Sequence, residues 1–375
     1  MHVMIYEVDF YMKVCHFTSA HPAKDIRIFI KESQSLAKAG HDVSLVVANA
    51  ETETDKGVHI IGVKSNIKGK LSRMLKTTVS VYKTALKQDA DVYHFHDPEL
   101  LPFGLLLKFK GKKVIYDVHE DVPRQILSKA WIPKALRGII SWTFEKFENF
   151  AAKRFSAIVG ATPYITERFV NLGCNAVNVN NYPVLSELYI AETDWSQKTK
   201  AVCYIGGINE IRGAKEMVEA IGKTNAKLFV GGKFSPPSLK DNLMTTEGWK
   251  NVIDLGFVSR EKVAETLSNS YSGLVLFHPK PNHINAQPNK MFEYMSAGIP
   301  VISSNFDLWK QIIEGNNCGI CVNPLDPNAI AEAISWIVEH PEEAKQMGVN
   351  GRQAIEQQYN WEQESIKLVR LYESI

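Results

Sequence analysis

The sequence has no apolar run of the ~18 residues that a membrane-spanning helix requires. Its N-terminus also lacks the basic segment and apolar core of a secretory signal. No low-complexity tract interrupts the 375 residues, of which 45% are apolar and 22% charged, as in soluble globular proteins. We therefore expect a cytoplasmic protein, and at this length one with two domains.

Cysteine and the common metal-binding motifs are also scarce. The five cysteines are an odd number and lie mostly in apolar, strand-like surroundings, which fits a reducing compartment. Cys318 and Cys321 form a CxxC, but no second pair of Cys or His with suitable spacing accompanies it. No DxD motif stands at a predicted strand end. The sequence thus predicts no metal site.

Acidic residues are under-represented in the first half. Residues 1–183 hold 25 Lys and Arg against 18 Asp and Glu, although the net charge of the whole chain is only +2. Seven basic residues and no acid lie between Lys64 and Lys87, and residues 129–155 mix basic with aromatic side chains. Two interpretations stay open: this half binds an anionic membrane surface, or a solvated basic face covers ordinary core aromatics. No recognised nucleic-acid-binding module accompanies the charge, so we expect no nucleic-acid partner.

Short β-branched runs alternate with helical segments along the chain, which favours an α/β protein with parallel sheets covered by helices on both faces. The expected strands are 13–17, 43–48, 92–95, 114–117, 157–160, 201–205, 227–231, 252–255, 274–277, 300–303 and 319–322. The polar stretch 178–200 predicts a break between two doubly wound domains, 1–183 (with a short extension at 1–11) and 184–358. We expect the ligand site in the cleft between them, at the carboxyl ends of the strands.

A short helix is predicted over residues 289–297, between Pro288 and Gly298. At ~100° per residue its apolar side chains share one face and Glu293 lies almost opposite. Lys290 lies in the first turn, where the helix dipole disfavours a cation unless an anion is bound there. Free N–H groups and Lys290 would then converge on a phosphate, and Glu293 would accept hydrogen bonds from hydroxyl groups. A surface helix with an incidental lysine is the alternative.

Polar clusters follow two of the predicted strands. One comprises Asp117, His119, Glu120 and Asp121, and the other comprises Gly206, Gly207 and Arg212. A histidine at a strand end is more often structural, but the three carboxylates around this one favour a functional role. The glycine pair lets the backbone approach a phosphate, and Arg212 can bind phosphate oxygens in a fork.

Five segments, in this order, carry a resemblance to a known family: "KVCHFTS" with "DIRIFIKESQSLAKAGHDV", "HFHDPELLP", "VIYDVHED", "YIGGINEIRG" and "PNKMFEYMSAGIPVI". The sequence resembles the retaining family 4 glycosyltransferases of the GT-B fold, especially the subgroup that acts in bacterial surface polysaccharide synthesis. The resemblance extends over nearly the whole chain from Met12. It implies two Rossmann-like domains, an N-terminal one on the acceptor side and a C-terminal one that binds the nucleotide-sugar donor, and a closing helix at 359–375 that crosses back to the N-terminal domain.

The resemblance also implies roles for single residues. Glu293 matches the second glutamate of the family's E-x7-E motif, which bonds the donor ribose. Arg212 matches the basic residue that grips the diphosphate, and His119 matches a histidine beside the transferred sugar. Backbone groups meet the nucleobase at positions that match Gly256, Phe257 and Val258.

The sequence departs from the family pattern at three places. The first glutamate of E-x7-E is Asn285 here, which puts the usual contact to the donor sugar in doubt. The family's other diphosphate arginine is Gly207, so we expect Lys290 to supply the missing charge. The glycine-rich loop after the first strand is replaced by "AHPAKDIRIF", in which Lys24 or Arg27 either meets phosphate or acceptor or has an exposed structural role.

The departure of a nucleoside diphosphate leaves negative charge, which fixed cations and helix N-termini stabilise. We expect Arg212, Lys290 and the helix start at Asn289 to do so without a metal, as is usual in the family. Retention would follow a same-face path in which the leaving phosphate oxygen takes the acceptor proton, while His119 orients the sugar. The candidates for acceptor binding are Asp117, Glu120 and Asp121.

The sequence therefore predicts a retaining, metal-independent glycosyltransferase without a separate cofactor. It would move a sugar from a nucleotide-diphosphate donor, a UDP-sugar in preference to a GDP-sugar, to a glycan or lipid-linked glycan, on the inner face of the cell membrane. A nucleotide-sugar 2-epimerase of the same fold and a non-catalytic nucleotide-sugar-binding subunit stay open as alternatives. A Rossmann dehydrogenase is disfavoured, because GxGxxG and an acidic residue ~20 positions further are missing.

Overall fold

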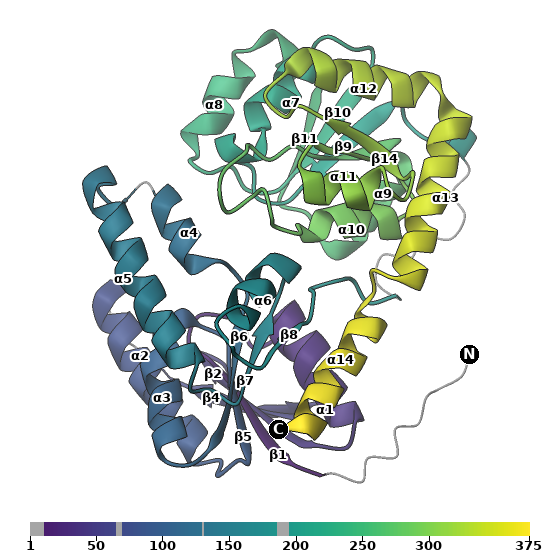
Figure 1. The fold of residues 1–375 in the computed structure, drawn as a ribbon. Helices are drawn as coiled ribbons and strands as arrows, with labels where there is room; N and C mark the ends of the chain where they lie inside the picture. The colour runs from purple at the N-terminus through teal and green to yellow at the C-terminus, as the bar shows by residue number, and fades with distance from the viewer. Residues whose placement is uncertain (1–10, 65–69, 130, 186–194) are drawn as a thin grey trace. The chain divides into compact units, whose positions relative to one another are not determined.

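The computed structural model describes residues 11–64, 70–129, 131–185 and 195–375 (Figure 1). Most of the predicted extension at 1–11 lies outside these residues, as do Lys68 in the basic stretch and the side chains of residues 70–75. The chain divides into two compact units. The N-terminal unit comprises Met1–Asn181 and Trp361–Ile375, and the C-terminal unit comprises Tyr182–Asn360. The sequence placed these boundaries after residues 183 and 358.

The described part of the N-terminal unit forms an eight-stranded sheet. In chain order its strands are β1 (Lys13–Thr18), β2 (Asp42–Ala48), β3 (Glu53–Asp55), β4 (Val58–Val63), β5 (Val92–Phe95), β6 (Lys113–Val118), β7 (Ala157–Gly160) and β8 (Ala176–Asn178). In space they follow the order β3-β4-β2-β1-β5-β6-β7-β8. All neighbouring pairs are parallel except β3 and β4, so the carboxyl ends of the central strands meet at one edge.

Helices cover both faces of this sheet (Figure 1). They are a π-helical segment (Ile26–Ser33), α1 (Gln34–Lys38), α2 (Lys70–Leu86), α3 (Leu101–Phe109), α4 (Val122–Ser128), α5 (Lys134–Ala152), α6 (Pro163–Val170) and α14 (Trp361–Ser374). No helix in the described ranges of the chain is long and apolar enough to cross a membrane.

The C-terminal unit is a second α/β layer structure, with a six-stranded sheet in its described residues. Its strands are β9 (Ala201–Ile205), β10 (Lys227–Gly231), β11 (Val252–Gly256), β12 (Ser272–Val275), β13 (Val301–Ser304) and β14 (Gly319–Val322), in the spatial order β11-β10-β9-β12-β13-β14. All pairs are parallel. Its helices are α7 (Ala214–Ile221), α8 (Ser238–Met244), α9 (Arg260–Asn269), α10 (Asn289–Ser296), α11 (Asp307–Ile313), α12 (Pro327–Glu339) and α13 (Pro341–Gln357). The predicted pair of doubly wound domains is confirmed.

The central strands are short apolar runs because both of their faces are buried. Every residue of β5 and β7 is buried, and the two strands belong to one core with the inner faces of α3 and α6. Local signals begin and end the helices of both units. Thr162 caps α6 by accepting from the N–H of Ile165 at 3.2 Å, and Gly298, with φ of +71°, ends α10.

The predicted strands differ from the observed ones in two ways: one was misplaced and three were missed. Residues 274–277 were expected as a strand, but β12 begins and ends two residues earlier, where Gly273 fits against the ring of Tyr294. A Cβ at Gly273 would lie 2.1 Å from that ring. β3, β4 and β8 were not predicted. β3 and β8 have only three residues each, and a short connection with β3 rather than a helix joins β2 to β4.

The last helix, α14, packs on the N-terminal unit, as the resemblance implied. Trp361 donates from Nε1 to Ser35 Oγ at 2.9 Å, and the Tyr372 hydroxyl lies 2.8 Å from Nδ1 of His94 in the sheet. Between them, the buried Glu364 accepts from the backbone N–H of Asn180 at 2.7 Å. These hydrogen bonds join the last helix of the chain to the first segment of the N-terminal unit.

We predict that Glu364→Ala lowers the free energy of unfolding by about 1–3 kcal/mol, because the N–H of the buried Asn180 loses its acceptor. Thermal melting and the hydrogen-exchange rate of the Asn180 amide measure this loss. The matched control is Arg370→Ala, which removes an exposed side chain from the same helix and should change stability by less than ~0.5 kcal/mol. Equal melting of the two variants would contradict the assigned role.

Candidate functional site

Helix α10 begins at the predicted residue and ends one residue earlier than predicted. Met291, Phe292 and Met295 are buried, whereas the side chain of Glu293 is 25% exposed. Pro288 precedes the helix and offers no side-chain cap, so the first-turn N–H groups keep their capacity to bind an anion. The exposed Asn289 marks this start.

Lys290 is buried, not exposed on the first turn as an incidental surface lysine would be. Its Nζ has no hydrogen-bond partner among the described residues, and it lies 3.8 Å from the centroid of the Tyr204 ring. Burial, together with the positive charge of Arg212, lowers the pKa of Lys290 to about 7. Burying a charged amine without a hydrogen-bonding partner costs free energy, so Lys290 is either neutral or paired with a bound anion.

The turn after β9 is shaped around two cations. Gly206 has a φ of +135°, and a Cβ there would lie 3.0 Å from Lys290 Nζ. A Cβ at Gly207 would lie 2.9 Å from Nη1 of Arg212, which donates to the Gly207 carbonyl at 3.2 Å. The glycine pair, Arg212 and Lys290, predicted from separate segments, are thus neighbours at the carboxyl edge of the C-terminal sheet. Two basic side chains, Arg212 and Lys290, lie there beside glycine backbone without side chains, which is an arrangement suited to binding an anion.

Glu293 does not stand free. Its carboxylate pairs with Arg260 Nη1 at 3.0 Å, an arginine at the start of α9 that the sequence analysis did not single out. The two partners are 25% and 46% exposed, so their pairing is weak and a ligand can replace it at little cost. Gly256 (φ +64°), Phe257 and Val258 form the turn before this helix, and the Phe257 side chain is 93% exposed.

Asn285 lies in the loop before α10, half-buried. The loop is anchored beside it, because Trp309 donates from Nε1 to the carbonyl of Ala286 at 2.7 Å. The expected contact of Asn285 with the donor sugar stays a prediction.

In the N-terminal unit, the end of β6 brings His119 and Asp117 together. Nε2 of His119 lies 2.6 Å from Oδ2 of Asp117, and the His119 side chain is 18% exposed. Asp117 is fully buried and pairs with Arg27, which is only 4% exposed. Arg27 is therefore too deeply buried for the exposed structural role that the sequence left open, and the acceptor contacts of Arg27 and Asp117 stay predictions.

The other residues predicted for the acceptor side lie nearer the surface. Lys24 pairs with Glu53 at 3.0 Å and with Asp55, and is about half exposed, so its exposed structural role is the one that the structure supports. Asp121 caps α4 at the N–H of Arg124. The exposed Glu120 accepts from the side chain of Gln125. Asp121 and Glu120 thus lie near the end of β6, where each accepts a hydrogen bond from a neighbouring residue of the chain. Their predicted contact with the acceptor stays a prediction.

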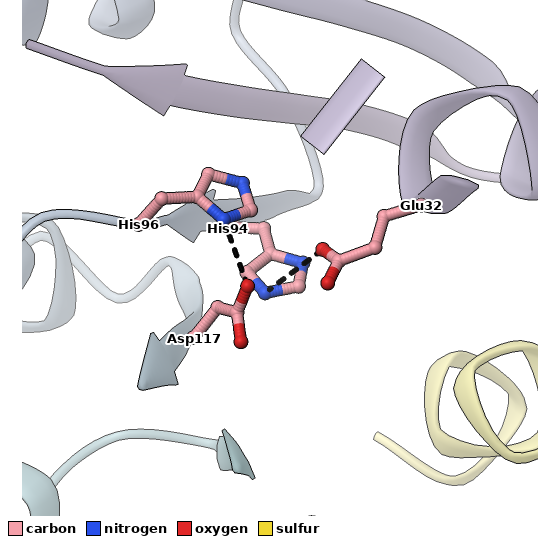
Figure 2. Close-up of side chains that lie close together, drawn as sticks. All are labelled: Glu32, His94, His96 and Asp117. Atoms are coloured by element: carbon pink, nitrogen blue, oxygen red, sulfur yellow. Dashed lines mark hydrogen bonds and ion pairs between the residues drawn. The ribbon is translucent and has the colours of Figure 1, made fainter. Parts of the chain in front are cut away.

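Figure 2 shows a buried group of potential metal ligands, made of Glu32, His94, His96 and Asp117. One ligand atom from each lies within 4.8 Å of the others. However, the guanidinium of Arg27 lies among them, 2.9 Å from Asp117 and 3.0 Å from Glu32. A divalent cation would have to be buried beside this fixed positive charge, so the group does not fit a metal. Burial and the charge of Asp117 raise the pKa of Glu32 well above its usual value, so a proton neutralises it instead.

The sequence analysis did not single out this histidine group, although a signal was present. His94 and His96 alternate in "HFHD", which places His94 in β5 and His96 directly after it, on the same side of the chain. His16 on the neighbouring β1 pairs in register with His94, and the three rings lie against one another.

Comparison with known families gives two adjacent matches. The model described as "Glycosyltransferase Family 4" matches residues 29–180, and the model described as "Glycosyl transferases group 1" matches residues 186–354. Together they cover both units of the chain.

Single relatives agree with these matches. D-rhamnosyltransferase WbpZ from Pseudomonas aeruginosa is 23% identical over 361 residues, which is 90% of each chain. Sucrose-phosphate synthase from Thermosynechococcus elongatus has a similar fold, with a TM-score of 0.79 at 17% identity over 96% of this chain and 98% of its own. Alr3699/HepE from Anabaena, solved in complex with UDP, has a TM-score of 0.74 at 13% identity over 97% and 100% of the two chains. The solved structures show that the chain has the GT-B fold.

We predict that Lys290→Met stabilises the free protein by about 1–3 kcal/mol near pH 7, because it removes a buried polar group without a partner. The gain should shrink as the pH rises from 7 toward 10.5. In that range the unfolded chain still binds the lysine proton that the folded chain, with its lowered pKa, has lost, so the wild type becomes more stable.

Thermal melting at several pH values measures both effects. Lys215→Met, which changes an exposed lysine of α7, is the control and should show neither. A stabilisation by Lys290→Met that did not vary with pH would argue against the assigned pKa.

Proposed function

We propose, since the chain belongs to the group 1 glycosyltransferases of family 4, that it is a retaining enzyme that moves a sugar from a nucleoside-diphosphate donor to a glycan or lipid-linked glycan of a surface polysaccharide. The observation that carries the proposal is the buried Lys290 beside Arg212 and the glycine turn. Neither side chain forms an ion pair with a carboxylate among the described residues. A diphosphate would supply the missing negative charge.

The same two cations suit the chemistry of the departing group. As the bond from the sugar to the diphosphate breaks, negative charge collects on the phosphate oxygens. Arg212 and Lys290 would stabilise it together with the first-turn N–H groups of α10, and phosphate binding would restore the proton on Lys290. Because positive charge is already in place, we propose that transfer needs no metal ion. The acceptor proton would pass to the leaving phosphate oxygen on the same face of the sugar.

The remaining donor contacts follow from the residues beside this anion site. Glu293 would exchange its exposed partner Arg260 for the ribose hydroxyls, and the backbone of Gly256, Phe257 and Val258 would meet the base. Because HepE was solved with UDP, a UDP-sugar is our first choice over a GDP-sugar. WbpZ is named a D-rhamnosyltransferase, which places deoxyhexoses among the donor sugars to test.

Nucleotide binding is the first test of this assignment. We predict that UDP or GDP, at 100 times its dissociation constant, stabilises the purified protein by ~2.7 kcal/mol without added metal, whereas NAD does not. Glu293→Gln should weaken this binding by about 10- to 100-fold, since a charged acceptor for the ribose is lost. Glu265→Gln, at an exposed residue of α9, is the matched control.

Three outcomes of this test would count against the assignment. A thermal shift with NAD alone would overturn the transferase proposal. Turnover of the donor sugar without any acceptor would favour the epimerase. Binding with no turnover for any acceptor would favour the non-catalytic subunit.

A second surface feature supports peripheral binding to an anionic membrane. The exposed apolar stripe of α5 comprises Leu136, Ile139, Ile140, Phe147 and Phe150. At ~100° per residue these side chains fall within one third of the helix circumference. The acids Glu145 and Glu148 lie on the opposite side, paired with Arg124 and Arg168. The acidic side chains of α5 are thus directed away from the stripe, and the exposed Lys146 flanks it.

We predict that Leu136→Gln with Ile139→Gln weakens binding to vesicles that contain anionic lipid by at least ~10-fold, because two side chains that are 49% and 65% exposed no longer enter the bilayer surface. Vesicle sedimentation at low and high salt measures this. The control replaces Leu106 and Phe109, which are 45% and 73% exposed on α3, by Gln. Equal loss of vesicle binding in the two double variants, including complete loss in both, would remove the α5 stripe as a membrane site.

A further inference from the structure

The carboxylate of Asp117 receives hydrogen bonds from three different side chains, although it is fully buried. Arg27 donates from Nη2 to Oδ1 at 2.7 Å and from Nε to Oδ2 at 2.9 Å. His96 and His119 both reach Oδ2, from Nδ1 at 3.0 Å and from Nε2 at 2.6 Å. One carboxylate thus joins a fixed cation to two rings, of which only that of His119 is partly exposed.

The charge of Asp117 decides where these rings carry their protons. The guanidinium of Arg27 and the two histidines hold the pKa of Asp117 well below its usual value, so its oxygens only accept hydrogen bonds. Nδ1 of His96 and Nε2 of His119 are therefore the protonated atoms. The 3.3 Å between these two nitrogens is a consequence of both pointing at one oxygen.

The same constraint extends deeper into the unit. Burial lowers the pKa of His96 and of His16, so both rings are neutral. With its proton on Nδ1, His96 accepts at Nε2 from Nδ1 of His16, 2.9 Å away. Arg27 is fixed at its other side, since Nη1 donates to the carbonyl of Val179 at 2.9 Å and Nε faces Glu32. Asp117 cannot rotate without breaking several of these bonds at once.

At the exposed end, this arrangement leaves one atom of His119 for a ligand. Nε2 is taken by Asp117, and Nδ1 makes no hydrogen bond with any described residue. In the neutral ring, Nδ1 is then an acceptor with a fixed direction. A sugar presents hydroxyl groups, which are the donors that such an atom selects.

We propose that Asp117 is a positioning residue, which through Arg27 and His119 Nε2 presents His119 Nδ1 as the hydrogen-bond acceptor for a hydroxyl of the transferred sugar. This inference rests on the proposed function, but the geometry that it uses belongs to the N-terminal unit alone. A purely structural ion pair between Arg27 and Asp117 would need no histidine at 2.6 Å on the exposed side.

The first test reads the tautomer in the wild-type protein. The two ring nitrogens of ¹⁵N-labelled histidine have separate chemical shifts, and His119→Gln assigns the signals of His119. In the neutral rings, we expect Nε2 of His119 and Nδ1 of His96 to carry the protons. A proton on Nδ1 of His119 would overturn the proposal, whatever the enzyme activity.

The second test measures turnover of the donor that the wild type uses best. Asp117→Asn, whose amide can donate as well as accept, should lower kcat by about 10- to 100-fold while leaving KM for the donor nearly unchanged. Combining it with His119→Gln should add little further loss, because both changes remove the same contact. Asp97→Asn is the matched control, since Asp97 is also buried at this sheet edge but binds Thr18 and Ser19.

Two results would overturn the positioning role. One is an equal loss of kcat in the Asp97 and Asp117 variants, and the other is full additivity with His119→Gln. If Asp117→Asn does not fold, the wild-type tautomer decides alone. If the wild type transfers no sugar from any donor, the proposed function fails, which the tautomer measurement distinguishes from failure of this inference.

Discussion

Parallel strands all end at the same edge of a sheet, and this constraint sets where the polar groups of the candidate sites lie in each unit. In the C-terminal unit the end of β9 supplies the glycine turn, and the end of β11 leads into the turn at Phe257. In the N-terminal unit the end of β6 supplies Asp117 and His119. Each unit therefore gathers polar groups from distant parts of the sequence at one edge of its sheet.

The two units handle buried charge in opposite ways. The negative charge of Asp117 is matched inside the fold by Arg27, so this pair is complete without a ligand. Lys290 has no such partner, and burial together with the positive charge of Arg212 lowers its pKa to about 7. Charges that are matched internally fix geometry, whereas an unmatched one costs stability until an anion arrives. This difference explains why we assign orientation to Asp117 and anion binding to Lys290.

Short apolar runs between helical segments were enough to predict the two sheets and nearly all of their central strands, because burial on both faces leaves such runs. Pro288 and Gly298 were enough to predict the helix at α10. It could not predict β3 and β8, which are too short to show a period. Motif order placed Gly206, Arg212 and Lys290 in one site, and the structure brings them together. The burial and the pairing of single side chains could not be predicted, because nothing in a residue's type shows that Arg27 is buried or that Arg260 pairs with Glu293.

The departures from the family pattern acquire a physical reason in the structure. A side chain at Gly207 would begin 2.9 Å from Nη1 of Arg212, so an arginine there would require the end of the Arg212 side chain to shift. We propose that the second positive charge of the anion site comes instead from Lys290 of α10. Its Nζ lies 3.8 Å from the centroid of the Tyr204 ring and beside Gly206, where a Cβ would be only 3.0 Å away. Glycine at positions 206 and 207 leaves Lys290 and Arg212 where they are, and in our proposal these two cations take the place of the missing arginine.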